Sequence, residues 1–527
     1  MPKERLYCAF AYNVHDSSVS FAIDNKVVLV LEAERIFNQK RKRCGKEEME
    51  YLIKYGLDYL GKKTEDVSRW VMTTLQNPLL WNDQINIYNE SGIPRDPFEG
   101  KFDILGEKRS VLVINHHLSH AATYLLSKFD NAIIITCDGG GDSECVAVFT
   151  ADKNIISRLS IDTHDLINGK FYGACSYFLY KELHSEGKMM ALASYGTPKD
   201  EVKKGLADIL NDLNRLDYFD SMRILQKRFP NINTDSKNIL EKDKLDFSAS
   251  TQAFFSEHRV RDIAGIMEKI NFRSKNLVMA GGVSLNLDTN TEILNAFPDT
   301  KHFIAPCCND TGQSLGALNM LVVKETGLRP EVKLPYLGMG KESISYKRDT
   351  ISKVTDILNR DGIVILHNSK AEIGPRALGN RSLIGRANSI AIKKKLSEEI
   401  KQREPYRPVA PVTIEVKVNE YFIGPRSSPF MLYKYEVLES KKNEIEGAVH
   451  HDGSARVQTI TKEWNPFLYD LIKTYGEKTG TYVLLNTSLN LRGDPISNTL
   501  EESLKIYEKI QGPKVLVYNG NIDKVDD

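Results

Sequence analysis

An apolar strand that ends in a glycine turn occurs twice in this chain, and this repeat limits the folds that the chain can adopt. The two copies are residues 133–138 followed by Gly139, Gly140 and Gly141, and residues 276–280 followed by Gly281, Gly282 and the polar Asn286. A backbone without side chains can approach a phosphate closely, and an acid beside it can hold a metal. The repeat therefore predicts two related half-domains that hold one nucleotide between them.

A pair of histidines precedes the first glycine turn. A short strand at residues 110–114 runs into a helix that carries His116 and His120. Residues four apart lie on one helix face, so both imidazoles can reach one point. Asp138 ends the following strand, which predicts a metal site beside the nucleotide phosphate. Asp310 stands where a later helix begins, and capping of that helix is its simplest interpretation.

Length and composition place the chain among ordinary globular proteins. Its 527 residues are too many for one core and predict two or three domains. A formal charge of +1 gives no global basic field for nucleic acid, and no apolar run is long enough to span a membrane. The seven cysteines have no C-x-x-C spacing and are expected to be reduced thiols. We therefore expect a cytoplasmic enzyme.

The first 270 residues alternate between strands and helices, which indicates an α/β fold. Strands are expected at residues 6–11, 17–23 and 27–34, and the loop between the first two carries His15 and Asp16. That loop is either a ligand contact or a plain turn. Residues 197–246 are charged and helical, which is typical of a peripheral insertion, and a long helix is expected at residues 251–270.

Six lysines or arginines lie between Arg35 and Lys46. A run of this kind is usually a solvated loop. The sequence leaves two alternatives open, namely contact with nucleic acid and contact with an anionic acceptor substrate.

A second group of basic residues follows a linker at residues 325–342. Loops rich in glycine and proline carry Arg376, Lys401, Arg403, Arg407 and Arg456, and a later strand leads into Asn486 and Ser488. Arginine matches phosphate oxygens with two parallel hydrogen bonds, and lysine acts as a point charge. Five such residues in the loops of one domain predict a pocket for a substrate with several phosphates.

The order of these motifs resembles the O-carbamoyltransferases of nodulation-factor and antibiotic biosynthesis. The motifs that carry the resemblance are residues 14–18, 115–122, 138–142, 281–283, 374–379, 407–411 and 486–488. The resemblance implies an actin-like, duplicated N-terminal domain at residues 1–340, of the kind found in tRNA threonylcarbamoyl transferases. It also implies a YrdC-like α/β domain at residues 345–527.

The resemblance further implies a reaction in two steps. Carbamoyl phosphate and ATP would give O-carbamoyl-adenylate and pyrophosphate in the second domain, and the first domain would transfer the carbamoyl group to a hydroxyl and release AMP. Arg376, Lys401, Arg407, Arg456 and Ser488 match the positions of the adenylate-forming site. His116, His120, Asp138 and Asp310 match the metal ligands, where Fe(II) is expected and Mn or Zn is allowed, with Mg for ATP. His15 matches a histidine of the acceptor pocket, and His15 or Asp16 would take the acceptor proton.

Two other functions remain as alternatives, namely a threonylcarbamoyl-adenylate-type tRNA modification enzyme and an actin-like nucleotide switch without transferase activity. A switch needs only one nucleotide site, so the basic loops of the second domain favour the transferase. The expected acceptor is a small molecule with a hydroxyl, such as a sugar, an antibiotic or a nucleotide. Neither a membrane nor duplex nucleic acid is an expected partner, and a homodimer is allowed.

Overall fold

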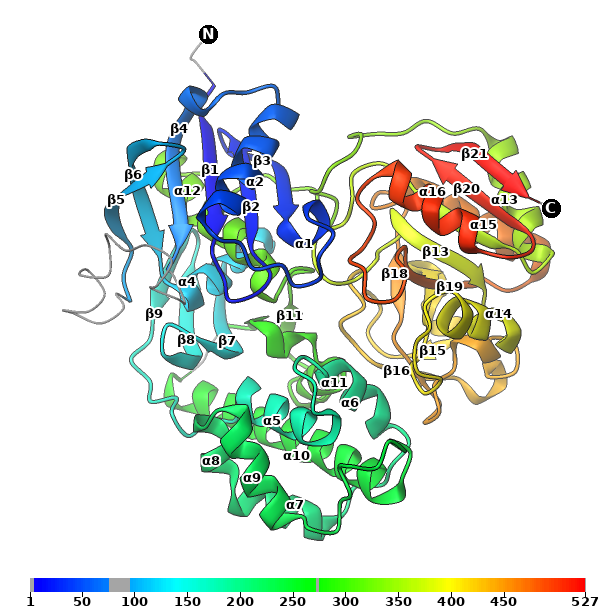
Figure 1. Cartoon of the computed structure of the whole chain (residues 1–527), viewed down its shortest axis with the longest axis horizontal. Coiled ribbons are helices and arrows are strands. Elements are labelled where there is room, and N and C mark those ends of the chain that lie inside the picture. Colours follow the sequence, from blue (N-terminus) through cyan, green and yellow to red (C-terminus); the bar gives the residue numbers. More distant parts are fainter. Residues whose placement is uncertain (1–3, 75–94, 272–273, 527) are drawn as a thin grey trace.

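The structure is a computed structural model that describes residues 4–74, 95–271 and 274–526. Two sheets and a group of helices form the N-terminal part, up to residue 326, and a third large sheet forms the C-terminal part, residues 348–526. Figure 1 shows the two parts side by side, with the helices of the middle of the chain below the two N-terminal sheets. Among the described residues, no helix is long and apolar enough to cross a membrane.

The first sheet has the strand order β3-β2-β1-β4-β6-β5. Its strands are β1 (Leu6–Ala11), β2 (Ser18–Ile23), β3 (Lys26–Glu32), β4 (Val67–Thr73), β5 (Phe98–Ile104) and β6 (Glu107–Ile114). The first three strands are antiparallel, whereas β4 and β6 run parallel to β1. The loop between β1 and β2 carries His15 and Asp16 at one end of this sheet.

The second sheet repeats the topology of the first. Its strands are β7 (Asn131–Gly141), β8 (Glu144–Asp152), β9 (Ile155–Arg158), β10 (Asn276–Ala280) and β11 (Lys301–Phe303). Read from β9, their order is β9-β8-β7-β10-β11, with three antiparallel strands and then two that run parallel to β7. This matches β3-β2-β1-β4-β6 strand for strand, so the predicted actin-like duplication is confirmed.

The glycine turns do not mark the two halves, which corrects the prediction. Both turns lie in the second sheet, because β7 and β10 are neighbouring parallel strands. The true counterpart of the turn after β7 is the loop after β1, which is polar and has no glycine run. The two halves therefore repeat one another in topology. The two glycine turns that suggested the repeat in the sequence are not equivalent loops of the two halves.

Helices fill the space between the two N-terminal sheets. Helix α12 (Gln313–Thr326) packs on β1, β2 and β4, and α4 (His116–Ala121) lies between α12 and β7. On the other face of the first sheet lies α2 (Lys46–Tyr59), with the short α1 (Ala33–Ile36) after β3. The core of this layer is continuous and includes Tyr124, Ile134 and Leu318.

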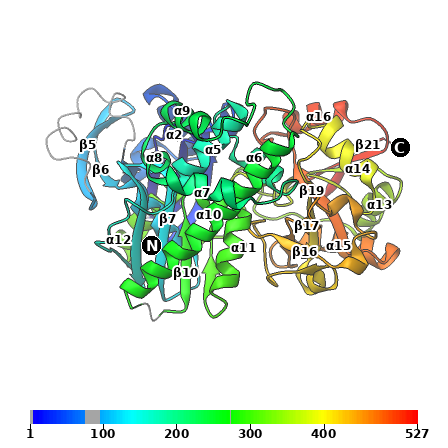
Figure 2. The same cartoon turned by 90° about the horizontal axis from the view of Figure 1, so that it is seen from below.

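A helical segment extends from the second sheet toward the C-terminal part (Figure 2). Its helices are α5 (Gly169–Tyr180), α6 (Glu186–Ala193), α7 (Asp200–Asp208), α8 (Leu210–Arg215), α9 (Tyr218–Arg228), α10 (Lys242–Lys269) and α11 (Leu287–Ala296). The predicted peripheral insertion corresponds to α7–α9. The long helix begins at Lys242 rather than at residue 251, since Phe247 and other side chains of its first turns are buried against α5 and α9.

The C-terminal sheet has seven strands in the order β18-β14-β19-β13-β12-β20-β21. They are β12 (Ile363–His367), β13 (Arg381–Arg386), β14 (Ala410–Ile414), β18 (Gln458–Ile460), β19 (Val483–Ser488), β20 (Lys514–Tyr518) and β21 (Asn521–Asp526). Alternate residues belong to separate cores, so that Ile365 packs on one face of the sheet and Val364 and Leu366 on the other.

Helices cover both faces of this sheet and leave its loops free for a site. They are α13 (Arg348–Asn359), α14 (Ile390–Lys394), α15 (Pro466–Thr479) and α16 (Leu500–Lys509), and a small sheet of β15 (Phe422–Ile423), β16 (Tyr435–Val437) and β17 (Ser454–Ala455) lies beside them. The basic residues that the sequence singled out lie in three of these loops: Arg376 between β12 and β13, Lys401, Arg403 and Arg407 before β14, and Arg456 between β17 and β18.

Candidate functional site

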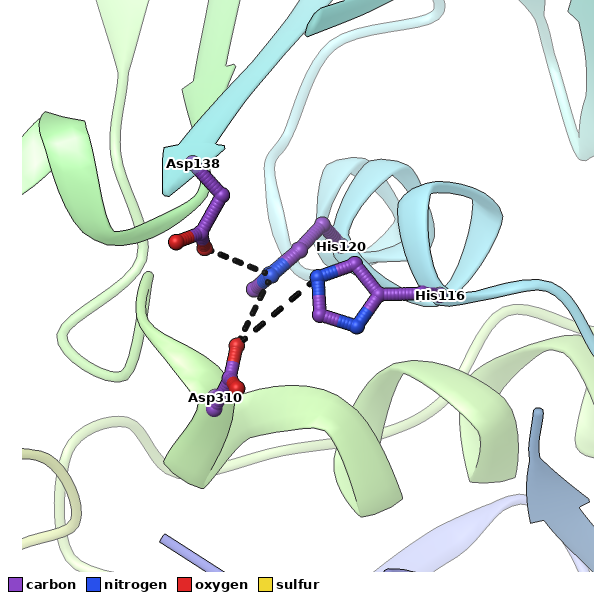
Figure 3. A group of neighbouring side chains, drawn as sticks. All are labelled: His116, His120, Asp138 and Asp310. Carbon is purple, nitrogen blue, oxygen red and sulfur yellow. Dashed lines mark ion pairs between the residues drawn. The ribbon is translucent and has the colours of Figure 1, made fainter. Parts of the chain in front are cut away.

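Two histidines and two aspartates from three elements meet in the N-terminal part (Figure 3). His116 and His120 lie on α4, Asp138 on β7, and Asp310 in the short turn Asp310–Gly312 before α12. His120 Nε2 lies 3.3 Å from Asp138 Oδ2 and 3.3 Å from Asp310 Oδ1, and His116 Nε2 lies 3.8 Å from Asp310 Oδ1. One ligand atom of each residue lies within 4.8 Å of the other three. The structure thus brings together all four residues expected to bind a metal.

The chemistry of this cluster fits a metal ion. Metal–ligand bonds of about 2.0–2.2 Å place the ligand atoms of one ion roughly 3–4 Å apart, and the three histidine–aspartate distances of 3.3, 3.3 and 3.8 Å fall in this range. Neither His120 Nε2 nor Asp310 Oδ1 makes a hydrogen bond within the described part of the chain, although both atoms are buried. Burial and the neighbouring charge of Asp138 raise the pKa of Asp310, and a cation between the carboxylates would relieve this repulsion.

Neighbouring groups orient the cluster, and the sequence did not identify them. Gln313 Nε2 lies 3.2 Å from His116 Nδ1, which directs Nε2 of that ring toward Asp310. The backbone N–H of His116 donates to Asp142 Oδ2 at 2.7 Å. Such supporting groups fix the orientation of metal ligands. In the sequence, Asp142 lies close to Asp138 in the glycine-rich motif, and this proximity could have identified it as a supporting residue. No feature of the sequence marks Gln313 in this way.

Asp310 does not cap its helix, which removes the simpler interpretation of this residue. The residue before the turn is Asn309, and its side chain makes no capping hydrogen bond. The Asp310 carboxylate instead points toward His116 and His120 (Figure 3). The sequence correctly placed Asp310 at the start of a helix, but the residue does not have the capping role that this position suggested.

The glycines around the cluster allow the backbone to pack closely against it. A Cβ on Gly141 would lie 2.1 Å from His116 Cδ2, and a Cβ on Gly281 would lie 2.2 Å from the Cys137 carbonyl oxygen. Asp138 accepts hydrogen bonds from Gly139 N at 2.6 Å and from Gly282 N at 2.8 Å. These turns, including Gly140, therefore surround the Asp138 carboxylate.

Asn286 is already satisfied by neighbouring groups. Its side chain accepts from Thr289 N, which caps α11, and exchanges hydrogen bonds with Gln252. A direct contact between Asn286 and a nucleotide would have to compete with these bonds. The sequence placed this residue after a glycine turn but had no means of showing its partners.

His15 and Asp16 lie beside the cluster, at the end of the first sheet. His15 Nδ1 is 3.0 Å from Asp16 Oδ2 and 3.9 Å from Asp310 Oδ2. The His15 ring also packs edge-on against His184, with 5.1 Å between the ring centroids. The loop after β1 and the turn after β7 thus face one another across the histidine–aspartate cluster, as the duplicated topology requires.

A second site lies between the C-terminal loops and the helical segment. It is a cavity of about 810 Å³. Arg403, Arg407 and Arg456 line it from the C-terminal side, and side chains of α6, α10 and α11 line it from the other. Arg456 Nε is buried without a hydrogen bond to any described group. Burial and the charges of Arg376, Arg403 and Arg407 hold the pKa of Arg456 well below its usual range, so this wall is strongly cationic.

Lys401 and Ser488 lie next to this cationic wall. The Lys401 ammonium donates to Ser488 Oγ at 2.6 Å and also to the Ser488 carbonyl and to Asn490 Oδ1. Burial and the charges of Arg403, Lys40 and Arg407 hold the pKa of Lys401 well below that of an ordinary lysine. Asn490 is thus a further site residue, two positions beyond the motif that ends at Ser488. Asn486 instead bonds Gln458 at 2.7 Å inside the sheet.

Arg376 lies at the junction of the two sites. Its guanidinium donates to the carbonyl of Leu285, in the turn after Gly282, at 3.3 Å. Burial lowers the pKa of Arg376 to about 10, with the Cys308 thiol and Arg407 as its titratable neighbours. The sequence placed Arg376 in the anion pocket with the other arginines. In the structure, Arg376 is not among the residues that line the cavity, and it contacts the N-terminal part instead.

The basic run at residues 35–46 is not one surface. Lys42 pairs with Glu48 at 2.5 Å and Lys46 with Asp103 at 3.0 Å. Lys40 makes no hydrogen bond or ion pair with any described residue, and Arg403 and Arg407 are among the charges that lower its pKa, after burial. Lys40 thus lies close enough to Arg403 and Arg407 for their charges to act on it, although the neighbouring charge of Glu34 opposes their effect. All seven cysteines are free thiols, as expected.

Two family models match this chain. The model for the carbamoyltransferase N-terminus matches residues 100–318, and the model for the carbamoyltransferase C-terminus matches residues 355–524. Each match contains one of the two candidate sites in large part.

Similar proteins span most of the chain. An uncharacterized protein of Methanocaldococcus jannaschii is 27% identical over 97% of this chain and 98% of its own length. Nodulation protein NolNO of Sinorhizobium fredii is 27% identical over 94% of this chain and 77% of its own. A 3'-hydroxymethylcephem-O-carbamoyltransferase of Streptomyces clavuligerus is 30% identical over 62% of both chains.

Proposed function

The chain belongs to the carbamoyltransferase family and is a transferase, and we propose that it forms O-carbamoyl-adenylate and then carbamoylates a hydroxyl. Residues 345–527 would form the adenylate, and residues 1–340 would transfer the carbamoyl group. The observation that carries the proposal is the presence of two unlike sites in one chain. One is a cationic cavity, and the other is a cluster of histidines and aspartates.

The first step would join two anions. Hydrolysis of carbamoyl phosphate gives carbamate and inorganic phosphate, and a carbamate oxygen attacks the α-phosphorus of ATP and displaces pyrophosphate. Arg403, Arg407 and Arg456 line the cavity, and Lys401 lies beside them. Fixed positive charges of this kind offset the repulsion between the substrates and stabilise the negative charge on the leaving pyrophosphate.

The second step would take place at the histidine–aspartate cluster. His116, His120, Asp138 and Asp310 would hold a divalent metal, which would supply a Lewis acid to neutralise negative charge on a phosphate. The His15–Asp16 pair, which lies beside Asp310, accepts the proton of the acceptor hydroxyl. The hydroxyl oxygen bonds to the carbamoyl carbon, and AMP leaves with the electrons of the broken C–O bond.

The acceptor is a small molecule that carries a hydroxyl. Support comes from the relatives, one of which is named for carbamoyl transfer to a hydroxymethylcephem. The His15 side chain is about one third exposed, so an acceptor can reach it from solvent. Fe(II) is the metal that the family resemblance favours, and the donor set of two imidazoles and two carboxylates agrees with it.

The test is release of phosphate and pyrophosphate from carbamoyl phosphate and ATP. The purified, metal-loaded protein should release both in equal amounts without an acceptor, since the adenylate is open to hydrolysis. Omission of either carbamoyl phosphate or ATP should abolish the release of pyrophosphate. Intact protein that releases no pyrophosphate above background would refute the proposal, and a nucleotide switch would then be the better account.

A further inference from the structure

The two walls of the cavity differ in chemistry. The C-terminal wall carries Arg403, Arg407 and Arg456. The facing wall belongs to the N-terminal part and is made of helices α6, α10 and α11, with alanines at five positions. These are Ala191, Ala193, Ala249, Ala253 and Ala296. The helical wall also carries the acids Glu257, Asp288 and Glu292, so the cavity has arginines on one side and alanines with carboxylates on the other.

The alanines leave a flat apolar strip on the helical wall. Ala249 and Ala253 are four residues apart on α10, so they lie on one face of that helix. Each ends at Cβ, which leaves space in front of the helix. Apolar walls with a few polar groups are typical of small-molecule sites, and 810 Å³ lies within the usual range of about 300–1,000 Å³.

Polar groups border the strip on α11. Asn295 and Glu292 line the cavity, are exposed, and make no hydrogen bond or ion pair with another residue in the described part of the chain. An amide offers both a donor and an acceptor, and a carboxylate accepts from hydroxyls. The Glu292 charge repels phosphate, so a ligand with one anionic end is oriented with that end toward the arginines.

Buried hydrogen bonds hold the wall in place before a ligand binds. Gln252 of α10 accepts from Tyr172 of α5 at 2.7 Å and donates to Ser256 at 3.0 Å, and Ser256 meets Thr289 of α11 at 2.9 Å. These bonds join three helices at the wall of the cavity, which Gln252 and Ser256 also line. A wall that is already ordered loses little entropy on binding.

We propose that this helical wall binds the adenosine half of ATP while the arginines of the facing wall bind its phosphates. A nucleotide has the same polarity as the cavity, with an apolar base and a ribose diol at one end and several negative charges at the other. The adenylate-forming site is then composite, because its adenosine half lies in the N-terminal part. This inference rests on the proposed function, since it names the binding mode of the first substrate.

The variant Ala253→Trp fills the strip and tests the proposal. We expect it to raise the KM for ATP in acceptor-free pyrophosphate release by about tenfold or more, a loss of roughly 1.4 kcal/mol of binding, with the KM for carbamoyl phosphate unchanged. Inhibition by AMP should be lost, whereas inhibition by inorganic pyrophosphate should remain. Ala264→Trp is the matched control, because Ala264 is an exposed alanine of α10 outside the cavity and should behave as wild type.

Three outcomes would overturn the proposal. An unchanged KM for ATP would show that the base binds elsewhere. Equal loss of inhibition by AMP and pyrophosphate would show a general disruption of the site. A change confined to the KM of the hydroxyl acceptor would assign the helical wall to the acceptor.

Photolabelling of the wild-type protein gives a second test that needs no variant. An azidoadenine analogue of ATP should label peptides of α10 and α11, with protection by AMP and not by pyrophosphate. Label confined to the turns around Asp138, or to the C-terminal sheet, would refute the adenosine site. Labelling of α10 and α11 without any pyrophosphate release would leave the adenosine site standing and refute the proposed reaction, so the two failures are distinguishable.

Discussion

The two candidate sites differ in how their charges are compensated. In the histidine–aspartate cluster, acids and imidazoles face one another at 3.3 Å, so the site carries its own counter-charges. On the arginine wall of the cavity, Arg407 lies 3.8 Å from Glu404, whereas neither Arg403 nor Arg456 forms an ion pair with a described residue. The first arrangement suits a cation that the protein keeps, and the second suits anions that come and go. The contrast predicts that the two sites respond in opposite ways to the same perturbations.

The largest expected effect separates the two proposed reaction steps. Arg456→Ala should lower pyrophosphate release by about 10²–10³-fold, because a fixed charge that faces the substrate phosphates is lost. His120→Ala should lose metal and carbamoyl transfer while it largely keeps pyrophosphate release. Coupled pyrophosphate and carbamoyl-transfer assays, with metal analysis of both proteins, measure this. The exposed Arg348→Ala on α13 is the control for loss of an arginine. Equal loss of the first step in both site variants would contradict the division into two sites.

A smaller effect is expected in thermal stability, where each site should respond only to its own ligand. A divalent metal should raise the Tm of wild type and Arg456→Ala but not of His120→Ala. Tripolyphosphate should raise the Tm of wild type and His120→Ala but not of Arg456→Ala. A ligand at 100 times its Kd stabilises by about 2.7 kcal/mol, which corresponds to a shift of several degrees. Differential scanning fluorimetry measures the shifts, and a crossed response would show that the sites share a ligand.

Removal of an uncompensated charge should also stabilise the ligand-free protein. Arg456 is largely buried among other cations, and Met has a similar length without the charge. Arg456→Met should therefore raise the free energy of unfolding without ligands by about 1 kcal/mol, although it abolishes the first step. Urea unfolding of wild type and variant measures the difference. A destabilised variant would show that the Arg456 charge has a structural partner that outweighs the repulsion.

The sequence predicted much of the histidine–aspartate cluster, and the limits of this prediction have a physical origin. His116 and His120 could be paired because helix geometry fixes residues four apart. Asp310 lies 172 positions after Asp138, and only the family resemblance joined them. Gln313 and Asn490 contact the sites through hydrogen bonds that depend on tertiary packing, and no spacing reveals such contacts.

The fold was predicted at the level of its class and duplication, and less well in detail. Alternation of strands and helices indicated an α/β fold, but the glycine turns suggested the wrong pair of equivalent strands. Strand pairing depends on contacts between distant residues, so β7 and β10 could not be recognised as neighbours. The sequence also could not predict the cavity between the two parts, because its two walls come from α10 and from a loop after residue 400.

The smallest expected effect tests whether the two parts are electrically independent. Lys40 belongs to the N-terminal part, yet its charge is among those that lower the pKa of Lys401 in the C-terminal part. A lysine with a lowered pKa is charged only below that pKa, so anion binding and pyrophosphate release should decline at a pH where an ordinary lysine is still protonated. Lys40→Ala removes one neighbouring cation, which raises the pKa of Lys401 and shifts this decline to higher pH.

The measurement is kcat/KM for ATP as a function of pH at two salt concentrations. The shift should shrink at high salt, because ions screen exposed charges beyond about 10 Å at 0.1 M. Lys54→Ala, on an exposed position of α2, should leave the profile unchanged. An unshifted pH profile for Lys40→Ala would mean that Lys40 does not act on the cavity. The charges of the cationic site would then come from the C-terminal part alone. A shift would mean that the N-terminal part contributes to the cationic site as well as to the metal cluster.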